Sequence, residues 1–362
     1  MRLKTATSSA LALALALAIA AVAGCGVPGD GSPVEEHESA LLSFAPLTLQ
    51  NGWTSTIYGT SAPASALSSG IVYLRGAISS GTTAFAFTLP AGQRPSATVY
   101  LPVNTCNATK GRLTIATDGT TSVTAENHAF GNAQCFTSLD GVSFAVSTTG
   151  YSAITLQNGW TAYGTRNPAA TIIGNVVHLA GAIKTAGTNH VAFTLPLGMG
   201  PSTNVYLPID LCNATKGRIL IDIGGMATIF AENDATAFSN AQCFTSLEGV
   251  SYPLTPESMS GFTCLDLQNG WVGMPYSTRM PCVKNDGGIV RLLGAVSSGT
   301  SVPFTLPAGM RPSGNVYVSA DLCNATQGRV LIDSTGAVTV QAEGGFGNAQ
   351  CFTSVEGVTF AP

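Results

Sequence analysis

The heptapeptide NAQCFTS, which runs from Asn132 to Ser138, decides how this chain is organised. It returns unchanged at residues 240–246 and 348–354, at a spacing of 108 residues both times. Solenoid units repeat roughly every 20 to 50 residues, so this longer period is that of a whole domain. The sequence therefore predicts three tandem modules, each with its own core.

Each module carries its own pair of cysteines. A CNAT segment with one cysteine precedes every heptapeptide, and the two cysteines of a module lie 28 to 31 residues apart. Recurrence favours pairing within a module. Without CxxC spacing or a recurring histidine, disulfides are favoured over zinc, and no metal or cofactor is expected. The predicted disulfides are Cys106 with Cys135, Cys212 with Cys243, Cys323 with Cys351 and, in the third module alone, Cys264 with Cys282.

Short runs of β-branched and aromatic residues fill each module, separated by Gly, Pro, Asn or Asp-Gly turn signals. Ile71 to Ser79 and Arg112 to Thr117 are two such runs in the first module. About seven runs in about 100 residues predict a β-sandwich or jelly roll. The expected fold class is all-β, with three tandem sandwich-like modules at 46–148, 153–255 and 262–362.

The N-terminal segment has the pattern of an export signal. Arg2 and Lys4 precede the apolar run from Ala10 to Val22, which is shorter than the roughly 20 residues of a spanning helix. The sequence predicts a lipoprotein signal peptide over residues 1–24. Residues 25–45 are rich in Pro, Gly, Ser and acidic residues, and they predict a flexible tether.

The signal ends in VAGC, which resembles a bacterial lipobox whose cysteine, here Cys25, is lipidated. Setting Cys25 apart from the nine cysteines leaves an even number for disulfides in an oxidising compartment. Gly26 follows in place of the aspartate that often retains lipoproteins at the inner membrane. We therefore expect a lipid-anchored protein of a bacterial cell envelope, at the outer membrane or the cell surface. An ordinary cleaved signal with a chance cysteine is the alternative.

Composition argues against one class of partner. Charged residues make up 9% of the chain and the net charge is -4. Proteins that bind nucleic acid cluster Lys and Arg against phosphates, and no stretch here does so. Nucleic acid is not an expected partner.

Several recurring motifs carry a resemblance to a known family. They are LQNGW, FTLPAGxRP (Phe87 to Pro95 and Phe304 to Pro312) and a closing LDGVSF (Leu139 to Phe144). Their order resembles the C-terminal β-sandwich module of bacteriophage tail fibres and minor tail proteins. The resemblance implies a compact β domain that contacts cell surfaces, often at the tip of a trimeric fibre. It also implies that the three linked copies assemble as a pseudo-threefold head within one chain, or that the chain forms homo-oligomers. In the second module Gly200 replaces the arginine of the motif.

Two sets of recurring carboxylates could serve acid–base catalysis, as in a glycosidase. The competing interpretation is structural, with acidic turns in the second set and, in the first, ion pairs to Arg112, Arg218 and Arg329. None of the histidines recurs across the modules, so no Ser-His-Asp triad is supported. We expect no enzyme and no catalytic residue. The carboxylates are Glu126, Glu232 and Glu343 in the first set and Asp140, Glu248 and Glu356 in the second, and the histidines are His37, His128, His178 and His190.

Aromatic residues are the best candidates for ligand contact. Trp53, Trp160 and Trp271 keep one place beside a strand end, which favours packing over sugar stacking. The segments 54–69, 161–175 and 272–287 differ between modules and are expected to be loops, where binding residues concentrate. The ligand-binding candidates in these segments are Tyr58, Tyr163 and Tyr276, with packing back onto the sandwich as the alternative.

These observations predict a non-enzymatic, adhesive head that recognises glycan or protein on a cell surface. The alternative is a structural subunit of an envelope or extracellular assembly that binds copies of itself.

Overall fold

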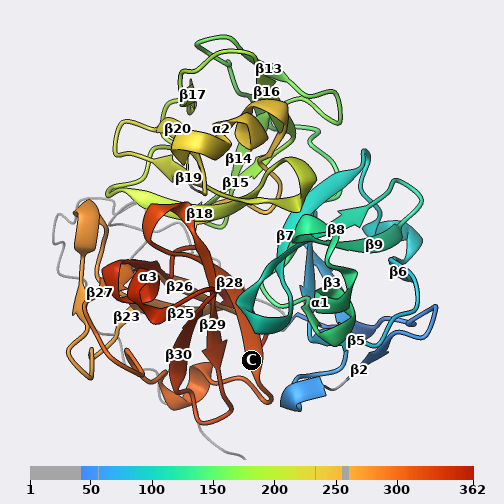
Figure 1. The fold of residues 1–362 in the computed structure, drawn as a ribbon, viewed down its shortest axis with the longest axis vertical. Helices are drawn as coiled ribbons and strands as arrows, with labels where there is room; N and C mark the ends of the chain where they lie inside the picture. Colours follow the sequence, from blue (N-terminus) through green and yellow to red (C-terminus); the bar gives the residue numbers. More distant parts are fainter. Residues whose placement is uncertain (1–41, 56, 233, 255–260) are drawn as a thin grey trace, which may run out of the picture. The chain divides into compact units, whose positions relative to one another are not determined.

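The computed structural model describes residues 42–55, 57–232, 234–254 and 261–362 (Figure 1). The predicted signal peptide, Cys25, His37 and most of the tether lie outside these residues. Residues 39–362 form one compact unit. Within the described part of the chain, no helix combines the length and the apolar character needed to cross a membrane.

Each module contains three small sheets, and all their strand pairs are antiparallel. The first sheet holds the strands at the two ends of the module, in the orders β1-β3-β4-β11, β12-β14-β15-β22 and β23-β25-β26-β32. The second has the orders β10-β5-β2, β13-β16-β21 and β24-β27-β31. The third has the orders β6-β9-β8-β7, β17-β20-β19-β18 and β28-β29-β30. The predicted all-β, multi-module class is confirmed.

The strands of the first module are β1 (Ala45–Pro46), β2 (Thr54–Ser55), β3 (Ala64–Ser68), β4 (Ile71–Arg75), β5 (Ala77–Ser79), β6 (Phe85–Thr88), β7 (Val99–Asn104), β8 (Lys110–Ile115), β9 (Thr120–Ala125), β10 (Thr137–Ser138) and β11 (Ser143–Ala145). Those of the second are β12 (Ser152–Ala153), β13 (Trp160–Ala162), β14 (Ala169–Ile173), β15 (Val176–Ala180), β16 (Ala182–Thr185), β17 (Val191–Thr194), β18 (Val205–Asp210), β19 (Lys216–Ile221), β20 (Met226–Ala231), β21 (Thr245–Ser246) and β22 (Ser251–Pro253). Those of the third are β23 (Thr263–Cys264), β24 (Val272–Gly273), β25 (Cys282–Asp286), β26 (Ile289–Leu293), β27 (Ala295–Ser297), β28 (Val316–Asp321), β29 (Gln327–Ile332), β30 (Val338–Ala342), β31 (Thr353–Ser354) and β32 (Thr359–Phe360).

Short helices connect the strands. The α-helices are α1 (Phe130–Cys135), α2 (Asp234–Cys243) and α3 (Phe346–Cys351). The 3-10 helices are η1 (Ile57–Gly59), η2 (Ala91–Gln93), η3 (Cys106–Ala108), η4 (Glu126–His128), η5 (Cys212–Ala214), η7 (Pro275–Ser277), η8 (Ala308–Met310) and η9 (Cys323–Ala325).

The heptapeptide spans the end of an α-helix and the following strand. In the first module α1 ends at Cys135, Phe136 is buried, and β10 follows. The helix holds Cys135 at a Cα separation of 5.7 Å from Cys106. All four predicted disulfides are present. The helices themselves were not expected, because segments of 6 to 10 residues are too short to show a clear helical period in the sequence.

Each module has its own apolar core. The three tryptophans belong to these cores, as predicted, and their exposed fractions are 3 to 5%. The indole N–H of Trp53 donates to the carbonyl of Thr83 at 2.9 Å, and the other two indoles make the equivalent bond. This bond satisfies the polar atom of a buried ring.

The predicted strand from Ile71 to Ser79 is wrong, because Gly76 divides it into β4 and β5. Gly76 has a φ of 86°, which a residue with a side chain rarely adopts. Its N–H donates to Asp140 Oδ1 at 2.8 Å in place of a strand partner. The segments 54–69, 161–175 and 272–287 were expected to be loops, but part of each forms a strand, because β3, β14 and β25 lie within them.

The three modules contact one another in a cycle. Strands β7, β18 and β28 each touch the other two, and Figure 1 shows them at the centre of three lobes. The Ser138 hydroxyl of the first module donates to the Tyr317 carbonyl of the third at 2.6 Å. The bonds from Ser246 to Tyr100 and from Ser354 to Tyr206 repeat this contact at 2.6 Å. The cycle closes, so the modules surround an approximate threefold axis.

A glycine in each closing turn lets the modules approach this closely. A Cβ atom at Gly141 would lie 2.5 Å from a methyl group of Val318, and one at Gly357 would lie 2.4 Å from Leu207. Gly249 faces Leu101 at 3.0 Å in the same way. The glycine of the closing motif therefore serves contact between modules as well as the turn.

Candidate functional site

The three candidate tyrosines lie at the boundaries between modules, with rings that are partly exposed. The exposed fractions are 54% for Tyr58, 41% for Tyr163 and 58% for Tyr276. Each ring packs against the buried phenylalanine of its own heptapeptide, with centroids 4.7 to 5.7 Å apart. One side of each ring therefore packs on its module, as the alternative expected, and the other side remains accessible, while ligand binding by these rings stays a prediction.

The backbone at two of these tyrosines is unusual. Tyr58 has a φ of 54° and so does Tyr276. Positive φ is uncommon for a bulky residue and costs on the order of 1 kcal/mol or more. Such conformations collect at binding sites, where the surrounding structure maintains them.

Behind each tyrosine, residues from the neighbouring module continue the contact. Phe136 packs on Tyr317 of the third module at 5.0 Å, and the guanidinium of Arg329 lies 4.8 Å from the Tyr317 ring centroid. We call each such set an aromatic stack. The three stacks are Tyr58, Phe136, Tyr317 and Arg329; Tyr163, Phe244, Tyr100 and Arg112; and Tyr276, Phe352, Tyr206 and Arg218.

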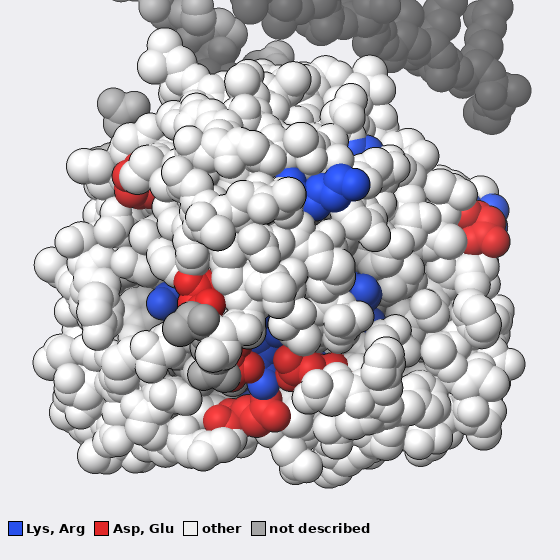
Figure 2. All heavy atoms as spheres, turned by 45° about the horizontal axis from the view of Figure 1, so that its top comes forward, with Lys and Arg blue, Asp and Glu red and all other residues white. Residues whose placement is uncertain are grey.

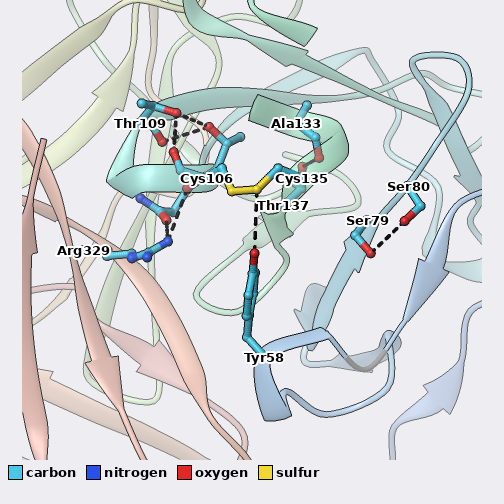
Figure 3. Close-up of a disulfide and its surroundings, with 11 residues drawn as sticks. Tyr58, Ser79, Ser80, Cys106, Thr109, Ala133, Cys135, Thr137 and Arg329 are labelled. Carbon is cyan, nitrogen blue, oxygen red and sulfur yellow. Dashed lines mark hydrogen bonds between the residues drawn. A yellow bond between two sulfur atoms is a disulfide. The ribbon is translucent and has the colours of Figure 1, made fainter. Parts of the chain in front are cut away.

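The module disulfide lies against the stack. Figure 3 shows Tyr58 pointing toward the bridge between Cys106 and Cys135, with Arg329 approaching from the third module. The Tyr58 hydroxyl lies 3.8 Å from Cys135 Sγ, and that of Tyr276 lies 3.7 Å from Cys351 Sγ. The disulfides, expected only to staple the modules, also contribute to the walls of these sites.

The arginines of the stacks are anchored across the module boundary. Arg218 Nη1 donates to Asp321 Oδ2 at 3.1 Å, Arg112 Nε to Asp210 Oδ2 at 2.5 Å, and Arg329 Nη1 to Asn104 Oδ1 at 2.9 Å. Burial raises the pKa of the Asp321 carboxyl to about 7, against the opposing charge of Arg218. These partners fix the guanidinium plane beside the aromatic rings.

The third stack lines a pocket of about 140 Å³, formed by Tyr206, Arg218, Tyr276, Cys323, Asn324 and Phe352. A second, more open hollow of about 670 Å³ shares Arg218 and Asn324 with it and extends to Phe230, Asp234 and Thr236. Arg218 Nε has no hydrogen-bond partner within the described ranges. This nitrogen is buried, so the groove itself presents the exposed ring of Tyr276 beside the partly exposed guanidinium of Arg218.

Sequence differences between modules shape this groove. Phe230 stands opposite Arg218 in the sheet register, whereas Thr124 faces Arg112 and Gln341 faces Arg329. Gln341 accepts a hydrogen bond from Arg329 Nε at 2.6 Å. The corresponding nitrogen of Arg218 faces a ring instead, and this leaves it unpaired.

The recurring glutamates were expected to pair with arginines, and this prediction is wrong. The carboxylates of Glu126, Glu232 and Glu343, one from each module, all converge on Lys216 Nζ at 3.0, 3.2 and 2.5 Å. Burial opposes the charge on Lys216, but the three carboxylates outweigh it and raise the lysine pKa. The acids of the closing turns accept backbone N–H groups at 2.7 to 2.8 Å, and Glu248 and Glu356 also bind Arg166 and Arg279.

The residues of one cavity were not predicted from the sequence, because their side-chain types differ from module to module. Tyr73, His178 and Arg291 occupy the same place in IVYLR, VVHLA and IVRLL, and the structure brings all three to one cavity. Alignment of the modules by strand would have placed them together. No group of three or more His, Cys, Asp or Glu suited to a metal occurs in the described part of the chain.

Comparison of the chain with protein-family models, with curated proteins and with solved structures finds no match. The resemblance to tail-fibre modules stays a prediction.

Proposed function

We propose that this is a lipid-anchored envelope protein of a bacterium whose three modules form a non-enzymatic recognition head. We further propose that the head binds glycans of a cell surface in the grooves between modules. The main support is the third aromatic stack, where the exposed Tyr276 lines one pocket together with Arg218 and Asn324.

The chemistry of this groove suits a sugar. A pyranose ring packs its C–H face on an aromatic ring, and a few fixed donors orient its hydroxyl groups. Tyr276 supplies the ring, while Arg218 and Asn324 supply donors. Figure 2 shows a face with few charged side chains, in keeping with 9% charged residues. Such a surface favours neutral or weakly charged ligands.

The compartment follows from cysteine chemistry. Four disulfides indicate an oxidising, extracytoplasmic environment. The lipid anchor at Cys25 and the outer-membrane or surface location belong to the proposal. Mass spectrometry of the N-terminal peptide for an acylated Cys25 tests them, and an unmodified peptide would contradict the anchor.

A glycan array probed with the purified full-length protein tests the binding function. We expect retention of a defined set of glycans and a loss of about five- to tenfold in affinity in Tyr276→Ala, because one stacking contact is removed. Tyr276→Phe keeps the ring and is the matched control. A blank array together with a blank whole-cell adhesion assay would contradict glycan recognition.

Two further measurements on the same protein separate the competing roles. Concentration-dependent oligomers in light scattering without glycan retention would favour a self-associating structural subunit. Release of reducing sugar that Glu232→Gln abolishes would favour an enzyme.

A further inference from the structure

Three strands at the same place in each module bring three different side chains together. Tyr73 on β4, His178 on β15 and Arg291 on β26 are equivalent residues of the repeat, and their exposed fractions are 8, 5 and 7%. Because equivalent residues meet, they surround the approximate threefold axis. The modules differ here in chemistry but not in position.

These three side chains leave hydrogen-bonding capacity unused. Arg291 Nη2 donates to Tyr73 Oη at 3.0 Å, so the hydroxyl proton of Tyr73 remains available. Arg291 Nε has no hydrogen-bond partner in the described residues, and the nearest carboxylate oxygen, Asp286 Oδ2, lies 3.9 Å away. The imidazole of His178 likewise makes no hydrogen bond to any described residue. Buried polar groups of this kind are costly unless something satisfies them.

The charge state of the cluster follows from its burial. Burial, aided by the nearby charge of Arg291, lowers the pKa of His178 to about 3. His178 is therefore neutral near pH 7 and keeps one N–H donor. Arg291 brings the only buried positive charge among the three residues, and the partly exposed Asp286 only weakly offsets it.

The side chains line a cavity of about 210 Å³ whose rim is built from all three modules. The rim residues belong to three β-hairpin turns, at 68–69, 173–174 and 286–287. The central residues of these turns, at 69–70, 174–175 and 287–288, all have positive φ, the arrangement of tight two-residue hairpins. Ser69 and Gly174 are exposed, so the cavity opens to solvent between the turns.

We propose that this cavity is a binding site for a small carboxylic acid, whose carboxylate accepts hydrogen bonds from Arg291, His178 and Tyr73. The three groups are donors that converge from three sides, and the guanidinium suits a carboxylate. A single cation matches a singly charged carboxylate better than a doubly charged phosphate. The volume is below the 300 to 1,000 Å³ or so of drug-sized pockets, which limits the ligand to a small acid or to the acidic end of a larger molecule. This site is separate from the aromatic stacks and does not depend on the proposed glycan binding.

Titration of the full-length protein, labelled with ¹⁵N in its histidines, tests the site with acetate as the probe. Acetamide has the same shape without the charge, sodium chloride controls for ionic strength, and inorganic phosphate tests the rival anion. We expect acetate to shift the imidazole resonances of His178 saturably, and acetamide and chloride to leave them in place. An acetate response no larger than that of chloride, or tighter binding of phosphate than of acetate, would overturn the proposal.

Substitution of Arg291, which lines the cavity, and of Ser68, on its rim, tests whether acetate binds in this cavity. Arg291→Gln should weaken acetate binding about ten- to hundredfold, because a charged hydrogen bond is lost. Arg311→Gln makes the same change at an arginine of the same module that lines no part of the cavity, and it should bind as wild type. Ser68→Trp alters an exposed rim residue and should block entry, which keeps the test valid if Arg291→Gln does not fold. Unchanged binding in both Arg291→Gln and Ser68→Trp would place acetate elsewhere.

Discussion

Two clusters in this protein take one side chain from the same position of each module, and they differ in outcome. In one, Glu126, Glu232 and Glu343 are identical and converge on Lys216. In the other, Tyr73, His178 and Arg291 are all different and surround a cavity. Lys216 occupies the centre of the first cluster. In the second cluster, Arg291 Nε has no hydrogen-bond partner among the described residues.

Divergence between the modules lets a residue of one module pair with equivalent residues of all three. Three identical charges at an axis repel one another, so an asymmetric counter-charge must hold them, and Lys216 provides it. Its equivalents in the other modules, Lys110 and Gln327, turn instead to Asp210 and Ser319. A true homotrimer could not assign one lysine to all three glutamates, but a single chain with three diverged modules can.

The largest difference in the free energy of unfolding is expected between substitutions of two buried arginines, one with a close carboxylate and one without. Arg279→Gln leaves Glu356, which is buried and now 2.6 Å from its partner, without a counter-charge, and should lower the free energy of unfolding by about 3 kcal/mol. Arg291→Gln removes a charge that has no close carboxylate and should cost less than about 1 kcal/mol. Urea denaturation of both variants measures the difference, and equal losses would show that Arg291 is as firmly paired as Arg279.

The lysine at the glutamate cluster gives the next largest effect. Lys216→Met should cost about 2 kcal/mol, because three carboxylates lose their common partner while two of them keep some contact with water. The exposed Lys184 in the same module is the control, and Lys184→Met should change stability by no more than about 0.5 kcal/mol. A double variant, Lys216→Met with Glu343→Gln, should recover part of the loss. Failure of the second substitution to recover any would contradict the proposed counter-charge.

A smaller change, which stabilises the protein, is expected in the first module, where a serine stands in place of the arginine of the other two modules. Ser61 occupies the place of Arg166 and Arg279, so Asp140 is buried without a cation like theirs, and burial raises its pKa to about 7 from 3.8. Folding then favours the protonated acid, and this contribution is present below pH 3.8 and lost as the pH rises through about 7.

Asp140→Asn should accordingly stabilise the protein at pH 8 by about 1 kcal/mol and leave stability at pH 3 nearly unchanged. Thermal unfolding at the two pH values measures this. Asp333→Asn is the control, because hydrogen bonds from Thr335 lower the pKa of the Asp333 carboxyl and its loss should not stabilise the protein at pH 8. An Asp140→Asn variant that is less stable at pH 8 would show that the carboxylate is needed in its charged form.

The number of modules, the all-β class and the disulfide pairs were predictable from the amino-acid sequence alone. These follow from local features, namely a repeated heptapeptide, β-type runs between turn signals, and cysteines that recur within one module. The packing of the tryptophans was predictable for the same reason, because their position beside a strand end repeats.

The tertiary structure alone decided which equivalent residues meet. Contacts around the axis join residues about 100 or more positions apart, such as Lys216 and Glu343 or Tyr73 and Arg291. No local pattern encodes such pairs, because a strand's sequence specifies which side chains face outward but not which surface covers them. NAQCFTS thus identifies the repeat, whereas the positions at which the repeats differ form the groove at Tyr276 and the cavity at Arg291.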